Sequence, residues 1–126
     1  TTPPVAGSPG PGRAGLNTTI GVVATDGALS RARCTKLAAV AHDGMARAIR
    51  PCHSMYDGDT VFALATGSAP APSDESFYEV LAAGADCFSR AVAHAMLAAR
   101  SVTTPAGSWP SYLDLLPSAA PAKGAR

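Results

Sequence analysis

The segment GLNTTIGVVATDG, residues 15–27, places one Asn and two consecutive Thr directly before a run of small and β-branched residues. Residues 19–25 (TIGVVAT) form a short, β-branched run that is apolar on both faces, which is typical of a strand covered on both sides. A stretch rich in Pro and Gly, residues 1–14, stands in front and is expected to be a linker or loop. The two hydroxyl groups therefore stand where a buried strand begins.

A helix and a second strand follow this segment. Ser30 can cap a helix that runs to about Arg50 and is ended by Pro51. Residues 60–66 (TVFALAT) have the composition of a second buried strand, closed by Gly67. The apolar stripe of the helix consists of Cys34, Leu37, Ala38, Ala41, Met45, Ala48 and Ile49.

The chain then continues into a second long helix. Ser73 or Ser76 can cap it, and Ser76 would form a capping box with Glu79. Gly44 and Gly84 lie inside the two helices, where Gly costs about 1 kcal/mol relative to Ala, so we expect close packing against a neighbouring backbone there. The apolar stripe of this helix consists of Phe77, Val80, Leu81, Gly84, Phe88, Val92, Ala95, Met96 and Ala99.

Alternating strands and helices predict an α/β (α+β) fold. Two strands are too few to bury two long amphipathic helices or to protect their own edges, so we expect a larger sheet whose other strands come from elsewhere. We divide the chain into residues 1–17, a linker that ends at Asn17; residues 18–100, the strand–helix core; and residues 101–126, a tail that residues 109–117 (WPSYLDLLP) can pin onto the body.

Composition and charge exclude several classes of partner. The 126 residues carry 10 Lys and Arg against 9 Asp and Glu, and the cations are scattered, so neither nucleic acid nor a membrane surface is an expected partner. No run appears long enough to cross a bilayer. Three cysteines at these spacings favour a reducing, cytoplasmic setting, and we expect no metal or cofactor. The residues considered as metal ligands or disulfide partners are Cys34, Cys52, Cys87, His42, His53 and His94.

The Asn17–Thr18 peptide bond is the first candidate for chemistry. A Thr hydroxyl is a poor nucleophile unless a base or the freed amine of its own chain lies beside it, and cleavage of the preceding bond would supply such an amine. In this interpretation the Thr18 hydroxyl attacks the carbonyl of Asn17, the ester hydrolyses, and Thr18 becomes a new N-terminus. The alternative is a simple turn that leads into the strand.

Asp57 and Asp59 are the second candidate. They flank Gly58, and residues i and i+2 of an extended segment point the same way, so the two carboxylates could face one site and titrate together. Such a pair could hold a hydroxyl or an ammonium group in a reactive geometry. The alternative is a polar Asp-Gly turn before the strand.

Three ordered segments, LNTTIGVVATD, KLAAVAHDGMARAIRP and DGDTVFALATG, together closely resemble the C-terminal, β-subunit part of the P1 (S58-type) family of peptidases. This self-processing group includes the L-aminopeptidase D-amidase/esterases, the β-peptidyl aminopeptidases and the nylon-oligomer endo-hydrolase. The resemblance spans about residues 15–117, and the Asn-Thr pair resembles the nylon-oligomer branch in particular.

The resemblance implies a precursor that cleaves itself into α and β subunits, here between Asn17 and Thr18, and then uses Thr18 for amide hydrolysis through an acyl-threonine ester. A pair of Asp residues assists the nucleophile in the nylon-oligomer branch, and the matching positions are Asp57 and Asp59. The family fold is a four-layer α-β-β-α sandwich, to which the α portion contributes the missing strands and most of the substrate pocket. A homo-oligomer of αβ units that acts on small peptides or amides is also implied.

Two other functions stay open. A non-catalytic fragment or assembly subunit would keep the fold and the motifs without the chemistry. An acyltransferase of the ornithine acetyltransferase type would also have a self-cleaving Thr, although its sequence around the cut differs. The physiological substrate is not identified by these residues, because the discriminating pocket walls are expected mainly in the α portion.

Overall fold

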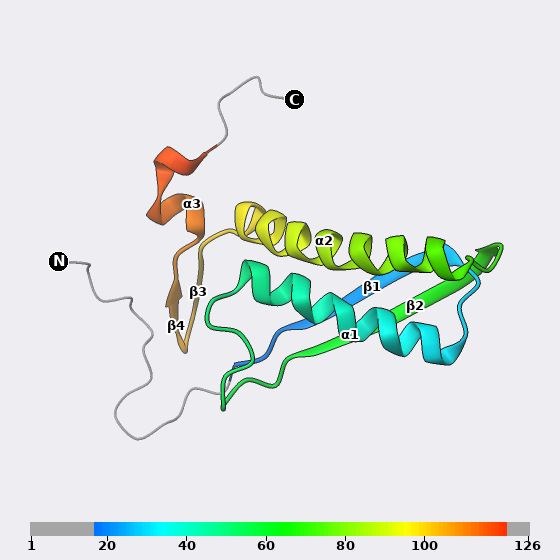
Figure 1. Ribbon diagram of the computed structural model, residues 1–126. Coiled ribbons are helices and arrows are strands. Elements are labelled where there is room, and N and C mark those ends of the chain that lie inside the picture. Colours follow the sequence, from blue (N-terminus) through cyan, green and yellow to red (C-terminus); the bar gives the residue numbers. More distant parts are fainter. Residues whose placement is uncertain (1–16, 121–126) are drawn as a thin grey trace. The chain divides into compact units, whose positions relative to one another are not determined.

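A computed structural model describes residues 17–120 and has mixed α/β structure, as predicted (Figure 1). These residues belong to two compact units, one reaching to Val92 and one starting at Ala93. The elements, in chain order, are β1 (Ile20–Gly27), α1 (Arg31–Ala48), β2 (Thr60–Ala69), α2 (Asp74–Ala98), β3 (Val102–Thr104), β4 (Gly107–Trp109), α3 (Tyr112–Leu115) and a 3-10 turn, η1 (Pro117–Ala119).

Strands β1 and β2 form a parallel pair, with Ile20 opposite Thr60 and Val22 opposite Phe62. The pairing is extended at its beginning by a bridge between Asn17 and Asp57. At the other end the register shifts after Thr25, and β2 continues to Ala69. The prediction that Gly67 closes the second strand is therefore wrong, because its φ of 71° is accommodated where the register shifts.

Both helices begin at serine caps. The Ser30 side chain accepts a hydrogen bond from the Arg33 backbone N–H at 3.3 Å, which confirms the predicted start of α1. Ser73 Oγ accepts from the backbone N–H of Ser76 at 3.2 Å. Of the two predicted caps for α2, Ser73 is therefore the one used, and Ser76 lies inside the first turn.

The core lies between one face of the β1–β2 pair and the two helices. Its buried side chains include Val23, Leu37, Met45, Val61 and Phe88, which come from all four elements. This packing joins β1, α1, β2 and most of α2 into the unit that ends at Val92.

Glycines at the element contacts allow this close approach. A Cβ on Gly44 would lie 2.0 Å from the carbonyl oxygen of Ala85, and one on Gly84 would lie 2.7 Å from Leu37. The prediction that both helical glycines mark close packing is confirmed, although Gly84 meets a side chain rather than a backbone.

The opposite face of the β1–β2 pair is bare within the described part of the chain. Ile20 and Val22 are 70% and 60% exposed on β1, and Phe62 and Leu64 are 57% and 55% exposed on β2. The strands were expected to be covered on both faces. Residues 17–120 cover only the face that packs against the helices. An apolar sheet face of this kind is typical of a surface that another part of the protein covers.

Helix α2 is long and apolar enough to cross a membrane by length and composition alone, so the expectation that no run has this property is wrong. Only Asp86 and Arg90 carry charge between Val80 and Leu97. Within the described residues α2 buries only Ala85 and Phe88 and is otherwise largely exposed. The expected absence of a membrane partner remains a prediction.

The unit that starts at Ala93 contains an antiparallel hairpin of β3 and β4, which the sequence did not predict. The segment after β4 is held by Asp114, whose carboxylate accepts hydrogen bonds from Ser101 and Ser111. These bonds lower the pKa of Asp114. The proposed division at residues 100 and 101 remains a prediction, and residues 1–16 and 121–126 lie outside the described part.

Candidate active site

The Asn17–Thr18 bond lies at the beginning of the parallel strand pair. The backbone N–H of Gly58 donates to the carbonyl oxygen of Asn17 at 2.8 Å, and the N–H of Asn17 donates to the carbonyl oxygen of Tyr56 at 3.3 Å. Two residues further on, the N–H of Thr60 donates to the carbonyl oxygen of Thr19 at 2.9 Å. The segment around the candidate cleavage site is therefore held along the 56–60 segment in extended conformation.

Thr18 itself is exposed and borders an open hollow of about 370 Å³. A Cβ built on Gly58 would come within 2.9 Å of Thr18 Oγ1, so Gly58 leaves the room that this hydroxyl occupies. The hollow is lined by Asn17, Thr18, Met55, Tyr56, Asp57 and Gly58.

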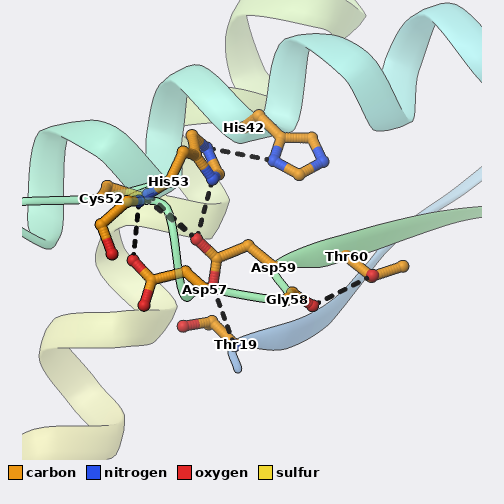
Figure 2. A network of polar contacts seen from close by, with 9 residues as sticks. Thr19, His42, Cys52, His53, Asp57, Gly58, Asp59 and Thr60 are labelled. Carbon is orange, nitrogen blue, oxygen red and sulfur yellow. Dashed lines mark hydrogen bonds and ion pairs between the residues drawn. The ribbon is translucent and has the colours of Figure 1, made fainter. Parts of the chain in front are cut away.

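Asp59 is the carboxylate most firmly held at this end of the sheet (Figure 2). Its side chain is only 6% exposed. Oδ1 accepts the backbone N–H of Thr19 at 2.9 Å, while Oδ2 accepts both the ring Nδ1–H of His53 at 2.8 Å and the His53 backbone N–H at 3.2 Å. The two oxygens thus connect the residue after Thr18 to the loop before β2.

Burial opposes the ionisation of Asp59, but hydrogen bonds from Thr19 and His53 favour the charged form. The balance places the pKa of Asp59 below its ordinary value, so this carboxylate is ionised at neutral pH. An ionised carboxylate accepts hydrogen bonds and donates none.

Asp57 has a separate set of partners. Its Oδ2 accepts the backbone N–H of Ser54 at 2.8 Å, which closes a local turn. In the structure neither Asp57 nor Asp59 makes a side-chain hydrogen bond to Thr18. The structure brings both acids to the segment that lines Thr18, but their joint action on the nucleophile remains a prediction.

Cys52, His53 and His42 complete a cluster that sequence reasoning missed. The sequence pattern alone assigns no role to Cys52, His53 or His42. In the structure Cys52 Sγ donates to Asp59 Oδ2 over 3.6 Å, and His42 Nδ1 lies 3.2 Å from His53 Nε2. No periodic pattern marks these residues, since a loop and the helix α1 bring them together.

The donor atoms of Cys52, His53 and Asp59 lie within 4.8 Å of one another, which invites comparison with a metal site. However, His53 Nδ1 and Asp59 Oδ2 are separated by 2.8 Å. Two ligands held about 2.0 Å from a tetrahedral zinc would be roughly 3.3 Å apart. The observed separation is that of a hydrogen bond, and we describe the group as a hydrogen-bonded cluster.

The Cys52 thiol is not suited to be a nucleophile here. Burial, followed by the negative charge of Asp59, raises the pKa of this thiol. The reactive form of cysteine is the thiolate, which a raised pKa disfavours. The hydroxyl of Thr18 therefore remains the candidate nucleophile at this end of the sheet.

Comparison with known proteins agrees with the motifs. Residues 4–109 match the sequence model of peptidase family S58. The chain is 50% identical over 115 residues to an uncharacterized aminopeptidase of Mycobacterium leprae, covering 82% of this chain and 31% of that protein. It is 46% identical over 115 residues to uncharacterized aminopeptidases of Mycobacterium bovis and Mycobacterium tuberculosis, covering 82% of this chain and 32% of each relative.

The chain thus spans about a third of the length of the curated relatives it matches, since the covered shares are 31% and 32%. The family match covers the candidate cleavage bond, both Asp residues and all four elements of the strand–helix unit. The predicted resemblance is confirmed at the level of the family, while the nylon-oligomer branch remains a prediction. The chain belongs to peptidase family S58.

Proposed function

We propose that this chain is the nucleophile-bearing part of a self-processing peptidase of the aminopeptidase type, cut between Asn17 and Thr18. The observation that carries the proposal is the hydrogen bond of 2.8 Å from the Gly58 N–H to the Asn17 carbonyl oxygen, on the bond that Thr18 would attack. A donor aimed at this oxygen stabilises the negative charge that develops during attack.

Self-cleavage would proceed in two balanced steps. The Thr18 Oγ forms a bond to the carbonyl carbon of Asn17, the C–N bond breaks, and the hydroxyl proton goes to the departing Thr18 nitrogen, directly or through water. Water then hydrolyses the resulting ester, which leaves a carboxylate on Asn17 and a free amine and hydroxyl on Thr18. The exposed position of Thr18 leaves space for that water.

Turnover of a substrate would repeat this chemistry on another amide. The Thr18 amine serves as the base for its own hydroxyl, the substrate acyl group forms an ester with Thr18, and water releases it. Asp59 supports the arrangement through Thr19, and Asp57 lines the hollow beside Thr18. The name aminopeptidase, which the relatives carry, supports small peptides with a free N-terminus as the proposed substrates of the whole protein, with other small amides as the neighbouring class.

A further portion of the same protein is the proposed partner. The bare apolar face of β1 and β2 is suited to pack against another sheet, as in a four-layer sandwich. We assign this role to the α portion of the precursor, and we place the resulting αβ units in a cytoplasmic homo-oligomer. That portion would also supply the pocket walls that select the substrate.

One observation favours a non-catalytic role as second candidate: no side-chain hydrogen bond joins Thr18 to Asp57 or Asp59 in the structure. A scaffold subunit would retain this arrangement without cleaving. The two candidates differ in whether the full-length precursor cuts itself.

The test compares three variants of the full-length precursor. Thr18→Ala should abolish both self-cleavage and the hydrolysis of aminoacyl anilides, whereas Thr18→Ser, which keeps a hydroxyl, should retain part of both. Thr103→Ala, on the exposed β3 strand, is the matched control and should behave as wild type. Turnover by the Thr18→Ala protein would remove Thr18 from the mechanism.

A further inference from the structure

We propose that His53, supported by His42, is a positioning residue for the nucleophile, an inference that rests on the proposed function. The path runs from His42 to His53, to Asp59 and to the backbone N–H of Thr19, each step joined by a hydrogen bond (Figure 2). Its last member is the peptide group that follows Thr18. The orientation of that peptide sets where the Thr18 hydroxyl points relative to the Asn17 carbonyl.

The first observation that supports a positioning role is that the two Asp59 oxygens have different partners. Oδ1 holds the Thr19 N–H at 2.9 Å, and Oδ2 faces the His53 ring at 2.8 Å. A carboxylate held at one oxygen only can rotate about its terminal torsion, which is broad. His53 restrains the second oxygen and so fixes the angle at which Oδ1 meets Thr19.

The backbone of His53 is the second support. Its φ is 57°, in the left-handed region that a residue with a side chain adopts uncommonly. This conformation allows both the backbone N–H and the ring Nδ1 of one residue to reach Asp59 Oδ2, at 3.2 Å and 2.8 Å. Unusual backbone geometry persists where the surroundings over-determine it, and such places are often functional.

Hydrogen-bond inventory then assigns the protons. Ionised Asp59 only accepts, so His53 Nδ1 carries the hydrogen. In a neutral His53 ring Nε2 is therefore an acceptor, and the neighbouring His42 Nδ1, 3.2 Å away, must be the donor. When both rings are neutral they are accordingly Nδ1–H tautomers. Asp59 fixes the tautomer of His53, because the other tautomer would turn a bare Nδ1 toward the carboxylate, and His42 donates to the Nε2 that this tautomer leaves unprotonated.

Neither Cys52 nor Asp57 can replace His53 as the hydrogen-bond donor to Asp59. Cys52 also faces Asp59 Oδ2, but as a weak thiol donor at 3.6 Å. Asp57 is engaged by the backbone of Ser54. His53 thus gives Asp59 Oδ2 a charge-assisted hydrogen bond at 2.8 Å, shorter than the contact from Cys52.

The first experiment reads the tautomers directly. Nitrogen-15 NMR of the full-length protein, labelled at histidine and measured at mildly alkaline pH, should show Nδ1–H forms for His42 and His53. His42→Gln and His53→Gln proteins assign the signals. An Nε2–H form of His53 would overturn the proposal, whatever the variants do to activity.

The second experiment measures self-cleavage and kcat in full-length variants. His53→Leu should slow both by roughly 100-fold, as expected for a misplaced reacting group, with KM nearly unchanged. His53→Asn keeps a donor near the Nδ1 position and tolerates a positive φ, so it should restore most of the loss. His94→Leu, on α2, is the matched control and should match wild type.

The outcomes separate the two proposals. Cleavage by the Thr18→Ala protein would contradict the proposed function itself. If Thr18 is required but a folded His53→Leu protein cleaves and turns over at the wild-type rate, only the positioning role is overturned. If His53→Leu fails to fold, the tautomers of the wild-type protein decide the question.

Discussion

The glycines at the helix contacts and the glycine beside Thr18 do different work in the same small unit. Gly44 admits the backbone of Ala85, so the two helices can approach closely. Gly58 instead leaves space for a hydroxyl group and points its N–H at the carbonyl oxygen of Asn17. The contact at Gly44 therefore determines how stably the unit folds, while the contact at Gly58 determines how Thr18 is placed for chemistry.

The largest expected effect is a loss of stability on substitution of Gly44. Gly44→Ala places a Cβ 2.0 Å from a backbone oxygen, which cannot move aside as a flexible side chain can. We expect a loss of about 3 kcal/mol in the free energy of unfolding. Urea unfolding of the full-length protein measures this loss. A loss below about 0.5 kcal/mol, as for a typical surface substitution, would show that close packing at Gly44 does not stabilise the unit.

Gly58→Ala should affect the rate of self-cleavage rather than the stability of the unit. Gly58 does not adopt a positive φ, so the backbone tolerates Ala, but the new Cβ would meet Thr18 Oγ1 at 2.9 Å. We expect self-cleavage to slow by about 10- to 100-fold while stability changes little. The time course of cleavage, followed by gel, gives the rate. An Ala variant that is strongly destabilised but cleaves normally once folded would contradict the assignment.

A smaller effect is expected on the pH dependence of stability, through Asp59. Because hydrogen bonds lower the folded-state pKa of Asp59 from the ordinary value of 3.8, its contribution to stability is complete above that value and is lost as pH falls through the folded pKa. The advantage of wild type over Asp59→Asn should therefore shrink only in strong acid. Urea unfolding of both proteins between about pH 5 and about pH 2 tests this, since Asp114 is common to both. A difference that grows in acid would have the wrong sign.

The smallest effect is expected at the ion pair between α1 and α2. Arg47 and Asp86 are 2.7 Å apart, but their side chains are 56% and 71% exposed. Solvent screens such pairs, so Arg47→Ala should cost less than about 1 kcal/mol and leave cleavage unchanged. Thermal unfolding with and without added salt provides the measurement. A large loss would show that surface charge, rather than close packing, holds the helices together.

The sequence predicted the regular parts of this unit because local rules decide them. Ser30 before a 3.6-residue stripe and Gly inside both helices are readable without a structure. The end of β2 was misplaced, since a register shift depends on the partner strand and not on Gly67 alone. The hairpin β3–β4 was missed because its strands are only three residues long.

The candidate site was predictable in part for the same reason. Thr18, Asp57 and Asp59 lie in segments whose spacing carries the family resemblance. His42 and His53 are eleven residues apart on a helix and a loop, and only the folded chain brings their rings within 3.2 Å. The separate partners of Asp57 and Asp59 also follow from loop geometry, which simple alternation along an extended segment does not capture.

Self-cleavage is tested most simply by the intact mass of the purified full-length precursor after incubation. Self-cleavage at the Asn17–Thr18 bond should give two fragments, the second beginning at Thr18, and the Thr18→Ala protein should keep a single uncut mass under the same conditions. A correctly folded wild-type precursor that keeps its full mass, or a fragment that begins at any other residue, would contradict the claim that the Asn17–Thr18 bond generates the nucleophile.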